Sequence, residues 1–364
     1  MMNGQIDLFK YTQQTSTDWK WTMANDYPQK NGLKVFSCFA CGGGSTMGYK
    51  LCGCEVLGCN EIDPRMNEVY VANHNPKYNY LEDIRDFNKR EDLPNELYDL
   101  DILDGSFPCS PFSMAGKREK DWGKEKKFTE GQKMQTLDDL AFVFIETVAK
   151  LRPKVVIAEN VKGILFGNAK KYVEKIYAQL NNIGYSVKHW VLKAEEMGVP
   201  QARHRVFFIA TRLDFDLSTI DMSFNYKPIT YGEIKTGVGV EINKKDGIIY
   251  QTLLKANKDD KTLCDTLKRT TGQSKWYQEQ VLNDNSICRT VRGDSGIYRV
   301  DEKTLISFED LLSISTFPQD FKNPISNSFW NLEYIVGMSV PPVMMKRVVS
   351  RLIDAGLFDY KLKN

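Results

Sequence analysis

The sequence lacks any uninterrupted apolar run of about 18 residues, the length that crosses a membrane, and its N-terminus lacks the apolar core of a secretory signal. It also lacks an excess of either charge, since 49 lysine and arginine residues oppose 47 aspartate and glutamate residues for a net charge of +2. No global basic field therefore indicates a nucleic-acid partner, and any such surface must be local. We expect a cytoplasmic protein without a membrane partner, whose eight cysteines are free thiols.

Five of the eight cysteines lie within the first sixty residues, namely Cys38, Cys41, Cys52, Cys54 and Cys59. Thiolates at such spacings can share a zinc ion. These cysteines are interleaved with strand and helix patterns, so their side chains would point to different faces. We expect small buried cysteines and no metal, while a metal-bound cluster remains as a structural alternative.

The 364 residues, of which 42% are hydrophobic and 26% charged, suffice for about two domains with a large core. Up to about residue 213, strand patterns alternate with helical periodicity. The predicted strands include 33–40, 55–63, 97–107, 155–160 and 205–213. The predicted helices include 64–74, 137–154 and 168–185. This alternation predicts an α/β fold with a doubly wound, mostly parallel sheet that binds ligands at the carboxyl ends of its strands.

After about residue 214 the alternation fades, and turns and lysines indicate a second, smaller domain. Helical spacing returns near the C-terminus. We expect four divisions: an N-terminal extension of unknown role at 1–32, an α/β domain at 33–213, a smaller domain at 214–325, and a segment at 326–364 that returns to the α/β domain.

The stretch DGSFPCSPFS places Cys109 between Pro108 and Pro111, directly after a predicted strand. Proline fixes φ and has no N–H, so the two prolines hold the cysteine in an extended turn that presents its side chain. Such a cysteine is either a buried packing residue or a nucleophile, and the stretch alone does not decide between them.

A glycine run, Gly42 to Gly44, follows the first predicted strand, and Glu61 lies near the end of the next strand. Glycine lets the backbone approach a ligand closely, and a carboxylate at the next strand end can bind ribose hydroxyls. The spacing is neither the G-x-G-x-x-G of dinucleotide enzymes nor that of a phosphate loop. An adenosyl ligand without a pyrophosphate, such as S-adenosylmethionine, would suit it, and a plain turn is the alternative.

Two further motifs fall at strand ends. The ENV motif places Glu159 and Asn160 at the same edge of the sheet as the cysteine turn, and QARHR places Arg203 and Arg205 two residues apart, hence on one strand face. An N-capping carboxylate and a solvated strand edge are the alternatives.

Residues 117–127 add six basic and three acidic side chains, a local charge of +3.

Taken in order, the motifs FACGGG, NEID, EDI, FPCSPFS, ENV, QARHR and GMSVPP resemble the cytosine-5 DNA methyltransferase family from roughly residue 33 to the C-terminus. The resemblance implies transfer of a methyl group from S-adenosylmethionine to C5 of cytosine in a specific DNA sequence, with S-adenosylhomocysteine as product. It implies that the target base is flipped out of the duplex. It also implies a catalytic and cofactor-binding domain at 33–213 and a target-recognition domain at 214–325.

The resemblance further implies roles for single residues. Cys109 is the implied nucleophile that attacks C6 of cytosine, and Glu159 the group that holds N3. Asn160, Arg203 and Arg205 are implied to orient the active-site loop and the base. The implied cofactor-binding residues are Phe39, Gly42, Gly43, Gly44, Glu61, Ile62, Asp83, Ile84, Pro108, Leu140 and Ser339. The implied DNA-binding loop contains Lys117, Arg118 and Lys120, whose phosphate contacts would make binding salt-dependent.

The sequence departs from the family pattern at three positions. Ser37 replaces the usual aspartate of the first motif, Cys41 replaces a glycine, and Met338 replaces the asparagine of the last motif. These departures concern cofactor affinity. The implied partners are duplex DNA and, in a restriction-modification setting, a cognate restriction endonuclease, with the enzyme acting as a monomer. A transfer RNA cytosine-5 methyltransferase and a catalytically silent DNA-binding homologue remain as alternatives.

Overall fold

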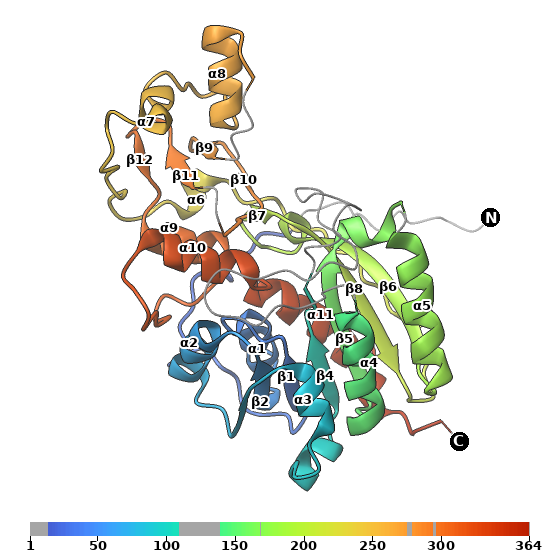
Figure 1. The fold of residues 1–364 in the computed structure, drawn as a ribbon. Coiled ribbons are helices and arrows are strands. Elements are labelled where there is room, and N and C mark those ends of the chain that lie inside the picture. The colour runs from blue at the N-terminus through green and yellow to red at the C-terminus, as the bar shows by residue number, and fades with distance from the viewer. Residues whose placement is uncertain (1–13, 109–138, 168, 275–278, 294–295, 364) are drawn as a thin grey trace, which may run out of the picture.

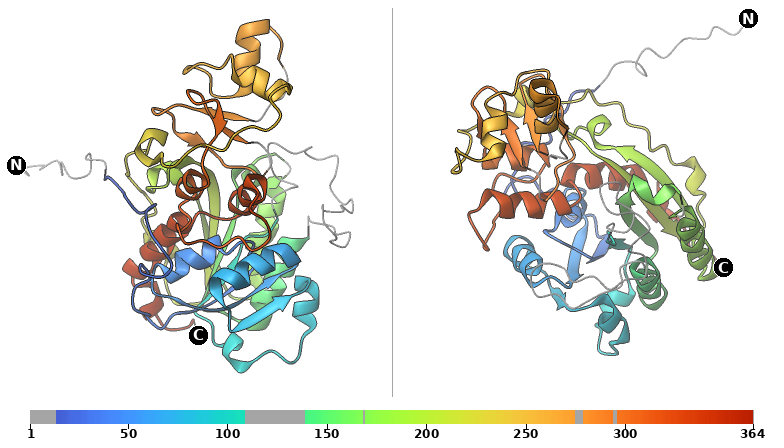
Figure 2. Two further views of the ribbon diagram at one scale, coloured as in Figure 1. Left: turned by 90° about the vertical axis from the view of Figure 1, so that its left-hand side faces the viewer. Right: turned by 45° about the horizontal axis from the view of Figure 1, so that its top comes forward.

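The structure is a computed structural model that describes residues 14–108, 139–167, 169–274, 279–293 and 296–363. It has two lobes, which Figure 1 shows one above the other. The larger lobe contains a seven-stranded sheet, and the smaller lobe runs from α6 to α9, residues 231–314. In both views of Figure 2 the smaller lobe projects beyond one end of the larger lobe.

The seven-stranded sheet has the strand order β3-β2-β1-β4-β5-β8-β6. Its strands are β1 (Lys34–Cys38), β2 (Glu55–Glu61), β3 (Tyr78–Leu81), β4 (Ile102–Gly105), β5 (Val155–Val161), β6 (Ser186–Lys193) and β8 (His204–Thr211). The strands from β3 to β5 in this order pair in parallel, whereas β8 runs antiparallel to both β5 and β6. The predicted doubly wound, mostly parallel sheet is therefore confirmed, and its parallel strands end at one edge.

Helices cover both faces of this sheet, because its central strands are apolar on both sides. The helices of the larger lobe are α1 (Gly44–Lys50), α2 (Pro64–His74), α3 (Ile84–Lys89), α4 (Leu140–Leu151), α5 (Ala169–Asn182) and α11 (Pro342–Asp354). One core, which includes Phe36 and Leu103 of the sheet, contains side chains of α3, α4 and α5. The opposite core, which includes Val35 and Ile157, contains side chains of α1 and α11. Residues 213–222 contribute apolar side chains to this second core.

The smaller lobe has its own apolar core. Its strands are β9 (Gln280–Leu282), β11 (Ile297–Arg299) and β12 (Thr304–Leu305), which form a sheet in the order β12-β11-β9. Its helices are α6 (Tyr231–Ile234), α7 (Ile248–Leu253), α8 (Leu263–Thr271) and α9 (Phe308–Ile314). The following helix, α10 (Phe329–Met338), adds Phe329, Leu332 and Val336 to the same core.

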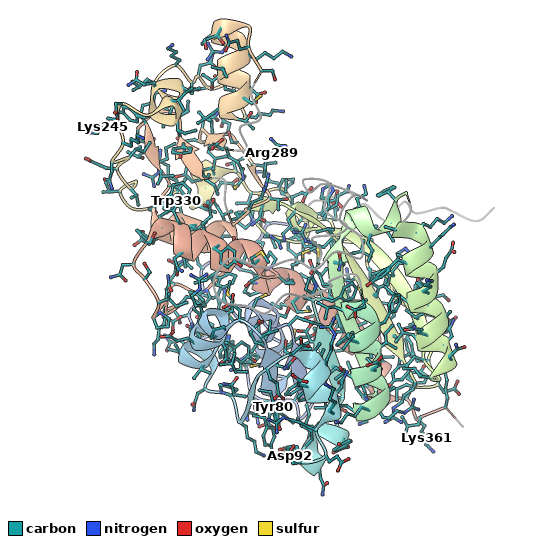
Figure 3. The ribbon with its side chains drawn as sticks, in the orientation of Figure 1. Tyr80, Asp92, Lys245, Arg289, Trp330 and Lys361 are labelled. Atoms are coloured by element: carbon teal, nitrogen blue, oxygen red, sulfur yellow. The ribbon has the colours of Figure 1, made fainter. Side chains whose placement is uncertain are left out.

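The two lobes join next to the carboxyl end of β5. There β7 (Gln201–Ala202) pairs in parallel with β10 (Cys288–Arg289), one residue before Arg203 and shortly before β8 begins. Arg289 is exposed on β10, at the edge of the smaller lobe (Figure 3). The smaller lobe is thus anchored beside the strand ends at which the sequence predicts the site.

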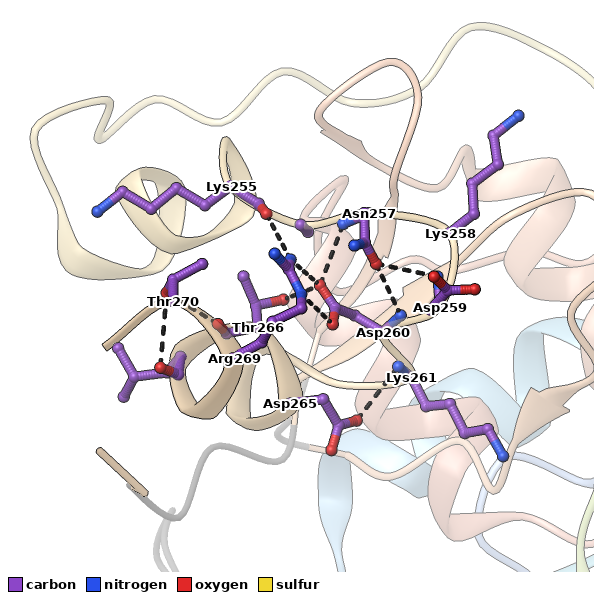
Figure 4. Close-up of polar contacts among 12 residues, drawn as sticks. Lys255, Asn257, Lys258, Asp259, Asp260, Lys261, Asp265, Thr266, Arg269 and Thr270 are labelled. Carbon is purple, nitrogen blue, oxygen red and sulfur yellow. Dashed lines mark hydrogen bonds and ion pairs between the residues drawn. The ribbon is translucent and has the colours of Figure 1, made fainter. Parts of the chain in front are cut away.

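A carboxylate network fixes the backbone at the start of α8 (Figure 4). Asp260 accepts a hydrogen bond from Arg269 Nη2 at 2.6 Å. Arg269 also donates to the carbonyl of Lys255 at 2.7 Å, which ties the residues after α7 to α8. Lys258 and Lys261 are exposed and extend away from this network. Lysine side chains are therefore presented from a fixed backbone at the far end of the smaller lobe.

Residues 14–32 form a strap, seen in dark blue in the left view of Figure 2. Trp19 and Trp21 are each 6% exposed and belong to the core of the smaller lobe. The indole Nε1 of Trp21 donates to the carbonyl of Thr316 at 2.8 Å, shortly after α9. The two tryptophans are thus packing residues in this structure.

The same strap is also tied to the larger lobe. Asp18 forms ion pairs with Arg347 and, at 3.4 Å, with Lys346, both on α11. Asn31 Nδ2 donates to the carbonyl of Cys52 at 2.9 Å. Residues 14–32, for which the sequence predicts no role, therefore brace one lobe against the other.

We expect Trp21→Ala to lower the free energy of unfolding by about 3 to 5 kcal/mol, because it leaves a cavity in a buried core and removes a hydrogen bond. Urea unfolding measures this loss. Trp330→Ala is the matched control, since Trp330 is 48% exposed on α10 (Figure 3). The control should change the free energy by less than about 1 kcal/mol. Equal losses in the two variants would contradict the bracing role.

Candidate active site

The ends of β4 and β5 meet the start of β8 at one edge of the sheet. The antiparallel register places Val161 opposite Arg205 and Glu159 opposite Phe207. Glu159 Oε1 and Arg205 Nε lie 2.8 Å apart, and their side chains are 10% and 12% exposed, respectively. Arg205 Nη1 also donates to the carbonyl of His204 at 2.8 Å. The guanidinium and the Glu159 carboxylate thus form a largely buried ion pair, although the Nε and Oε1 atoms do not meet hydrogen-bond geometry.

Asn160 is buried beside this pair and holds the neighbouring strand end. Its Nδ2 donates to the carbonyl of Phe107 at 3.0 Å, and its Oδ1 accepts from the backbone N–H of Val161 at 2.9 Å. Phe107 is followed by Pro108, which is half-buried. Asn160 therefore fixes the backbone that leads into the cysteine turn.

Several predicted residues of this turn lie outside the described residues. They are Cys109, the DNA-binding residues Lys117, Arg118 and Lys120, and Pro111 of the turn itself. Their roles stay predictions.

Arg203 and Arg205 have different partners. Arg203 is buried just before β8 and donates through Nη1 to the carbonyl of Gly337 at 3.1 Å. Gly337 lies in the last turn of α10, two residues before Ser339. Arg205 contacts Glu159, whereas Arg203 ties the strand to the C-terminal segment.

The glycine-rich turn packs against other parts of the chain at each of its three glycines. A Cβ on Gly42 would lie 2.5 Å from Ile335 Cγ2, and one on Gly44 would lie 2.1 Å from the carbonyl oxygen of Val340. Gly43 has a φ of +83°, and its Cβ would lie 2.1 Å from His74 Nε2. Glycine is therefore required here by the close approach of α2 and the α10–α11 segment.

Glu61 fixes the same turn by accepting hydrogen bonds from backbone N–H groups. Its Oε2 accepts from the backbone N–H of Cys41 at 2.8 Å, and its Oε1 accepts from those of Ile62 and Asp63 at 2.8 and 2.9 Å. Burial raises the pKa of Glu61, while these hydrogen bonds oppose the rise. Phe39 and Ile62 are half-buried beside it. A carboxylate next to partly exposed apolar side chains fits the ribose and flat ring of an adenosyl group.

The other predicted cofactor residues lie at helix ends: Asp83 and Ile84 at the start of α3, Leu140 at the start of α4, and Ser339 directly after α10. Asp83 caps α3 by accepting from the N–H of Arg85 at 2.8 Å, and Arg85 also forms an ion pair at 2.6 Å with Asp139, which precedes Leu140. Ile84 and Leu140 share one apolar core with Phe107 and with the packed Phe39 ring. Ser339 is buried and donates to the carbonyl of Ile335 at 2.8 Å. The structure thus brings Ile84 and Leu140 into one core with Phe39, and it places Ser339 next to Gly42 and Gly44.

Gln201 is a further residue of this region, for which the sequence motifs predict no role. It is buried, and its Nε2 donates to Ser315 Oγ at 3.2 Å while its Oε1 accepts from the N–H of Val291 at 3.1 Å. It therefore ties the join of the lobes to the residues after α9. Its position as the first residue of the QARHR motif is the sequence signal for this role.

The clustered cysteines are separate thiols in the structure. Cys38, Cys54 and Cys59 are buried, and burial raises the pKa of the Cys54 thiol to about 12. Within the described part of the chain, no three histidine, cysteine or acidic side chains gather as a metal site. Likewise, none of the helices in the described ranges is long and apolar enough to span a membrane.

Comparison with known proteins gives consistent matches. The family model of C-5 cytosine-specific DNA methylases matches residues 33–354. The type II methyltransferase M.NgoFVII of Neisseria gonorrhoeae is 34% identical over 194 residues, which are 53% of this chain and 47% of that protein. M.BsuFI of Bacillus subtilis is 27% identical over 349 residues, 93% of this chain and 77% of that protein. The chain thus spans about half the length of M.NgoFVII in alignment.

Solved structures share the fold. DNMT2 of Spodoptera frugiperda matches with a TM-score of 0.61 and 16% identity over 88% of this chain and 100% of that chain. Dnmt2 of S. pombe matches with a TM-score of 0.57 and 15% identity over 89% of this chain and 99% of that chain. At these identities the likeness concerns the fold alone.

Proposed function

Because the chain belongs to the C-5 cytosine-specific DNA methylase family, we propose that it transfers a methyl group from S-adenosylmethionine to C5 of cytosine in a specific sequence of duplex DNA. The observation that carries this proposal is the buried Glu159–Arg205 pair at the end of β5, beside the strand that leads through Pro108 to Cys109. A carboxyl group and a thiol are the groups that activation of a cytosine ring needs.

The proposed chemistry divides between these two groups. Cytosine is a poor electrophile at C6 and its N3 is a hydrogen-bond acceptor, so the carboxyl group of Glu159, held by Arg205, would donate a proton to N3 and draw electron density from the ring. The Cys109 thiolate then bonds to C6, which makes C5 nucleophilic. When bound, S-adenosylmethionine supplies the electrophilic methyl group that C5 receives. A general base such as a water molecule then takes up the C5 proton, the bond between C6 and Cys109 Sγ breaks to release the thiolate, and the proton at N3 returns to Glu159.

The surrounding residues would position these groups. Asn160 would keep the cysteine turn in place, because its amide holds the carbonyl of Phe107. Arg203 would keep the start of β8 against the C-terminal segment through Gly337. Misplacement of a reacting group by about 1 Å can cost a hundredfold in rate, so such contacts matter for catalysis.

The proposed cofactor site lies at the ends of β1 to β4. Glu61 would bind the ribose hydroxyls, and Ile62 and Ile84 would contact the adenine with Asp83 at its amino group. The remaining residues proposed to line the site are Phe39, Gly42, Gly43, Gly44, Pro108, Leu140 and Ser339.

C5 of cytosine cannot be reached inside a stacked duplex, so the target base must be flipped out at a cost of a few kcal/mol. Lys117, Arg118 and Lys120 are proposed to contact DNA phosphates from the loop after Cys109. We further propose action in the cytoplasm as a monomer, with a cognate restriction endonuclease as partner in a restriction-modification system. A stable dimer in sedimentation would contradict the monomer.

Transfer of labelled methyl groups tests the proposed function. The full chain is incubated with labelled S-adenosylmethionine and either mixed-sequence duplex DNA or bulk transfer RNA. We expect label on C5 of cytosine in DNA alone. Label on transfer RNA alone would reassign the substrate to RNA, and label on neither would sink the proposed activity in favour of a silent DNA-binding role.

Met338 lies beside the proposed cofactor site. It is 50% exposed at the end of α10 and precedes Ser339, whose Oγ lies 3.4 Å from the Cβ position of Gly42. A thioether is only a weak acceptor, whereas asparagine offers two donors and an acceptor. We expect Met338→Asn to lower the KM for S-adenosylmethionine by roughly three- to tenfold, with kcat unchanged. Steady-state kinetics measure this.

A surface substitution far from the turn controls for general effects. Val238→Asn changes a residue of the smaller lobe that is almost fully exposed, and it should leave both constants at the wild-type value. An unchanged KM in Met338→Asn would show that this position does not face the cofactor.

A further inference from the structure

A buried carboxylate that the proposed chemistry does not use lies under the glycine-rich turn. Asp104 is on β4 and is 1% exposed. Its Oδ2 accepts from Ser37 Oγ at 2.6 Å, and its Oδ1 accepts from Tyr49 Oη at 3.1 Å. Ser45, at the start of α1, also lowers the pKa of this carboxyl. Asp104 and Ser37 are register partners on adjacent strands.

The partners of Asp104 flank the turn on both sides. Ser37 lies on β1, just before the turn, whereas Ser45 and Tyr49 lie on α1, just after it. One carboxylate therefore holds both ends of the turn. Asp104 lies on β4, which ends at Gly105, two residues before Phe107.

The surroundings of Asp104 make its charge sensitive to pH near neutrality. Burial raises the pKa of its carboxyl to about 7, and the negative charge of Glu159 on β5 contributes, while the hydroxyl donors oppose the rise. The other titratable groups that interact with it are Cys38 on β1, Tyr49 on α1 and Tyr70 on α2. On protonation, one carboxyl oxygen becomes a donor, so acceptor capacity for the hydroxyls is lost.

We propose that Asp104 is a positioning residue for S-adenosylmethionine. The ionised carboxylate of Asp104 holds the glycine-rich turn in the form that binds the cofactor. This inference rests on the proposed function, since it requires the turn to bind that cofactor. It also accounts for Ser37, where the family pattern has an aspartate. In this chain Ser37 on β1 and Asp104 on β4 form a hydrogen-bonded pair, so the carboxylate between these two strands comes from β4.

Calorimetric titration of the full chain with S-adenosylmethionine between pH 5.5 and pH 8 tests this without any turnover. The ionised form is the binding form, so affinity should fall as pH drops through about 7, by roughly five- to tenfold in total. Asp104→Asn should bind with the wild-type low-pH affinity across the range. Titration of the cofactor's own amino group would appear equally in both proteins, so the difference between their profiles reports Asp104.

Two further variants sharpen the test. Ser37→Ala removes a donor that stabilises the ionised form, so the midpoint of the profile should move to higher pH. Asp101→Asn is the matched control, because Asp101 is buried just before β4 but forms an ion pair with Lys154 instead, at 2.7 Å. It should keep the wild-type profile. Circular dichroism confirms that each variant is folded.

The outcomes separate this inference from the proposed function. A wild-type profile that is flat, or one that Asp104→Asn reproduces in full, overturns the role of Asp104 while leaving methyl transfer intact. Absence of binding at every pH overturns both. The inference is supported if the affinity of the wild-type protein for S-adenosylmethionine falls at low pH, if Asp101→Asn shows the same fall, and if Asp104→Asn does not.

Discussion

Replacing Cys109 with serine is expected to abolish methyl transfer to DNA, with a loss of roughly a thousandfold or more in kcat, because a serine hydroxyl is scarcely ionised where a thiol yields appreciable thiolate. The substitution changes one atom, so DNA binding and cofactor binding should stay near the wild-type level. Single-turnover assays with labelled S-adenosylmethionine measure the rate, and a mobility shift measures DNA binding.

A second cysteine serves as control for this change. Cys264→Ser alters a half-buried thiol on α8 of the smaller lobe, far along the chain from the sheet edge, and should retain full activity. Wild-type protein should also form a complex with duplex DNA that survives denaturation when the target carries 5-fluorocytosine, since fluorine at C5 blocks elimination. Methyl transfer by Cys109→Ser at above about a tenth of the wild-type rate would rule out a covalent role for this thiol.

The sheet and the placement of the site were predictable because local signals suffice for them. A short run such as VVIAEN, apolar almost throughout, is typical of a strand buried on both faces, and its polar end then lies at the carboxyl edge of the sheet. This is where Glu159 and Asn160 are found. Glu61 and the glycine-rich turn were predicted at the same edge, because they too come at the ends of predicted strands.

Other contacts depend on partners that no local pattern specifies. Trp21 donates to a carbonyl 295 residues away, so its burial in the smaller lobe follows from the complete fold and not from its neighbours. The pairing of Ser37 with Asp104 depends on the register of two parallel strands that a crossover separates in sequence. Gln201 likewise acquires its partners only when the two lobes join.

The second large effect is expected at Glu159. Glu159→Gln keeps the size of the side chain but removes its charge and its ability to exchange a proton, so polarisation of the cytosine ring at N3 is lost. We expect kcat to fall by roughly a hundredfold to ten-thousandfold, with DNA affinity changed little. Rapid-quench measurement of methyl transfer under saturating DNA and cofactor separates this loss of rate from any change in binding.

Substitution of Arg205 tests whether this residue only orients Glu159 or takes part in the chemistry itself. Arg205→Lys keeps a positive charge beside Glu159 but cannot reproduce the planar guanidinium contact now made by Nε at 2.8 Å, so it should lose less activity than Glu159→Gln. Arg205 would act only by holding the carboxylate, and the double variant should therefore be no slower than Glu159→Gln alone. If the double variant lost activity by the product of the two single losses, Arg205 would act on the base independently of Glu159.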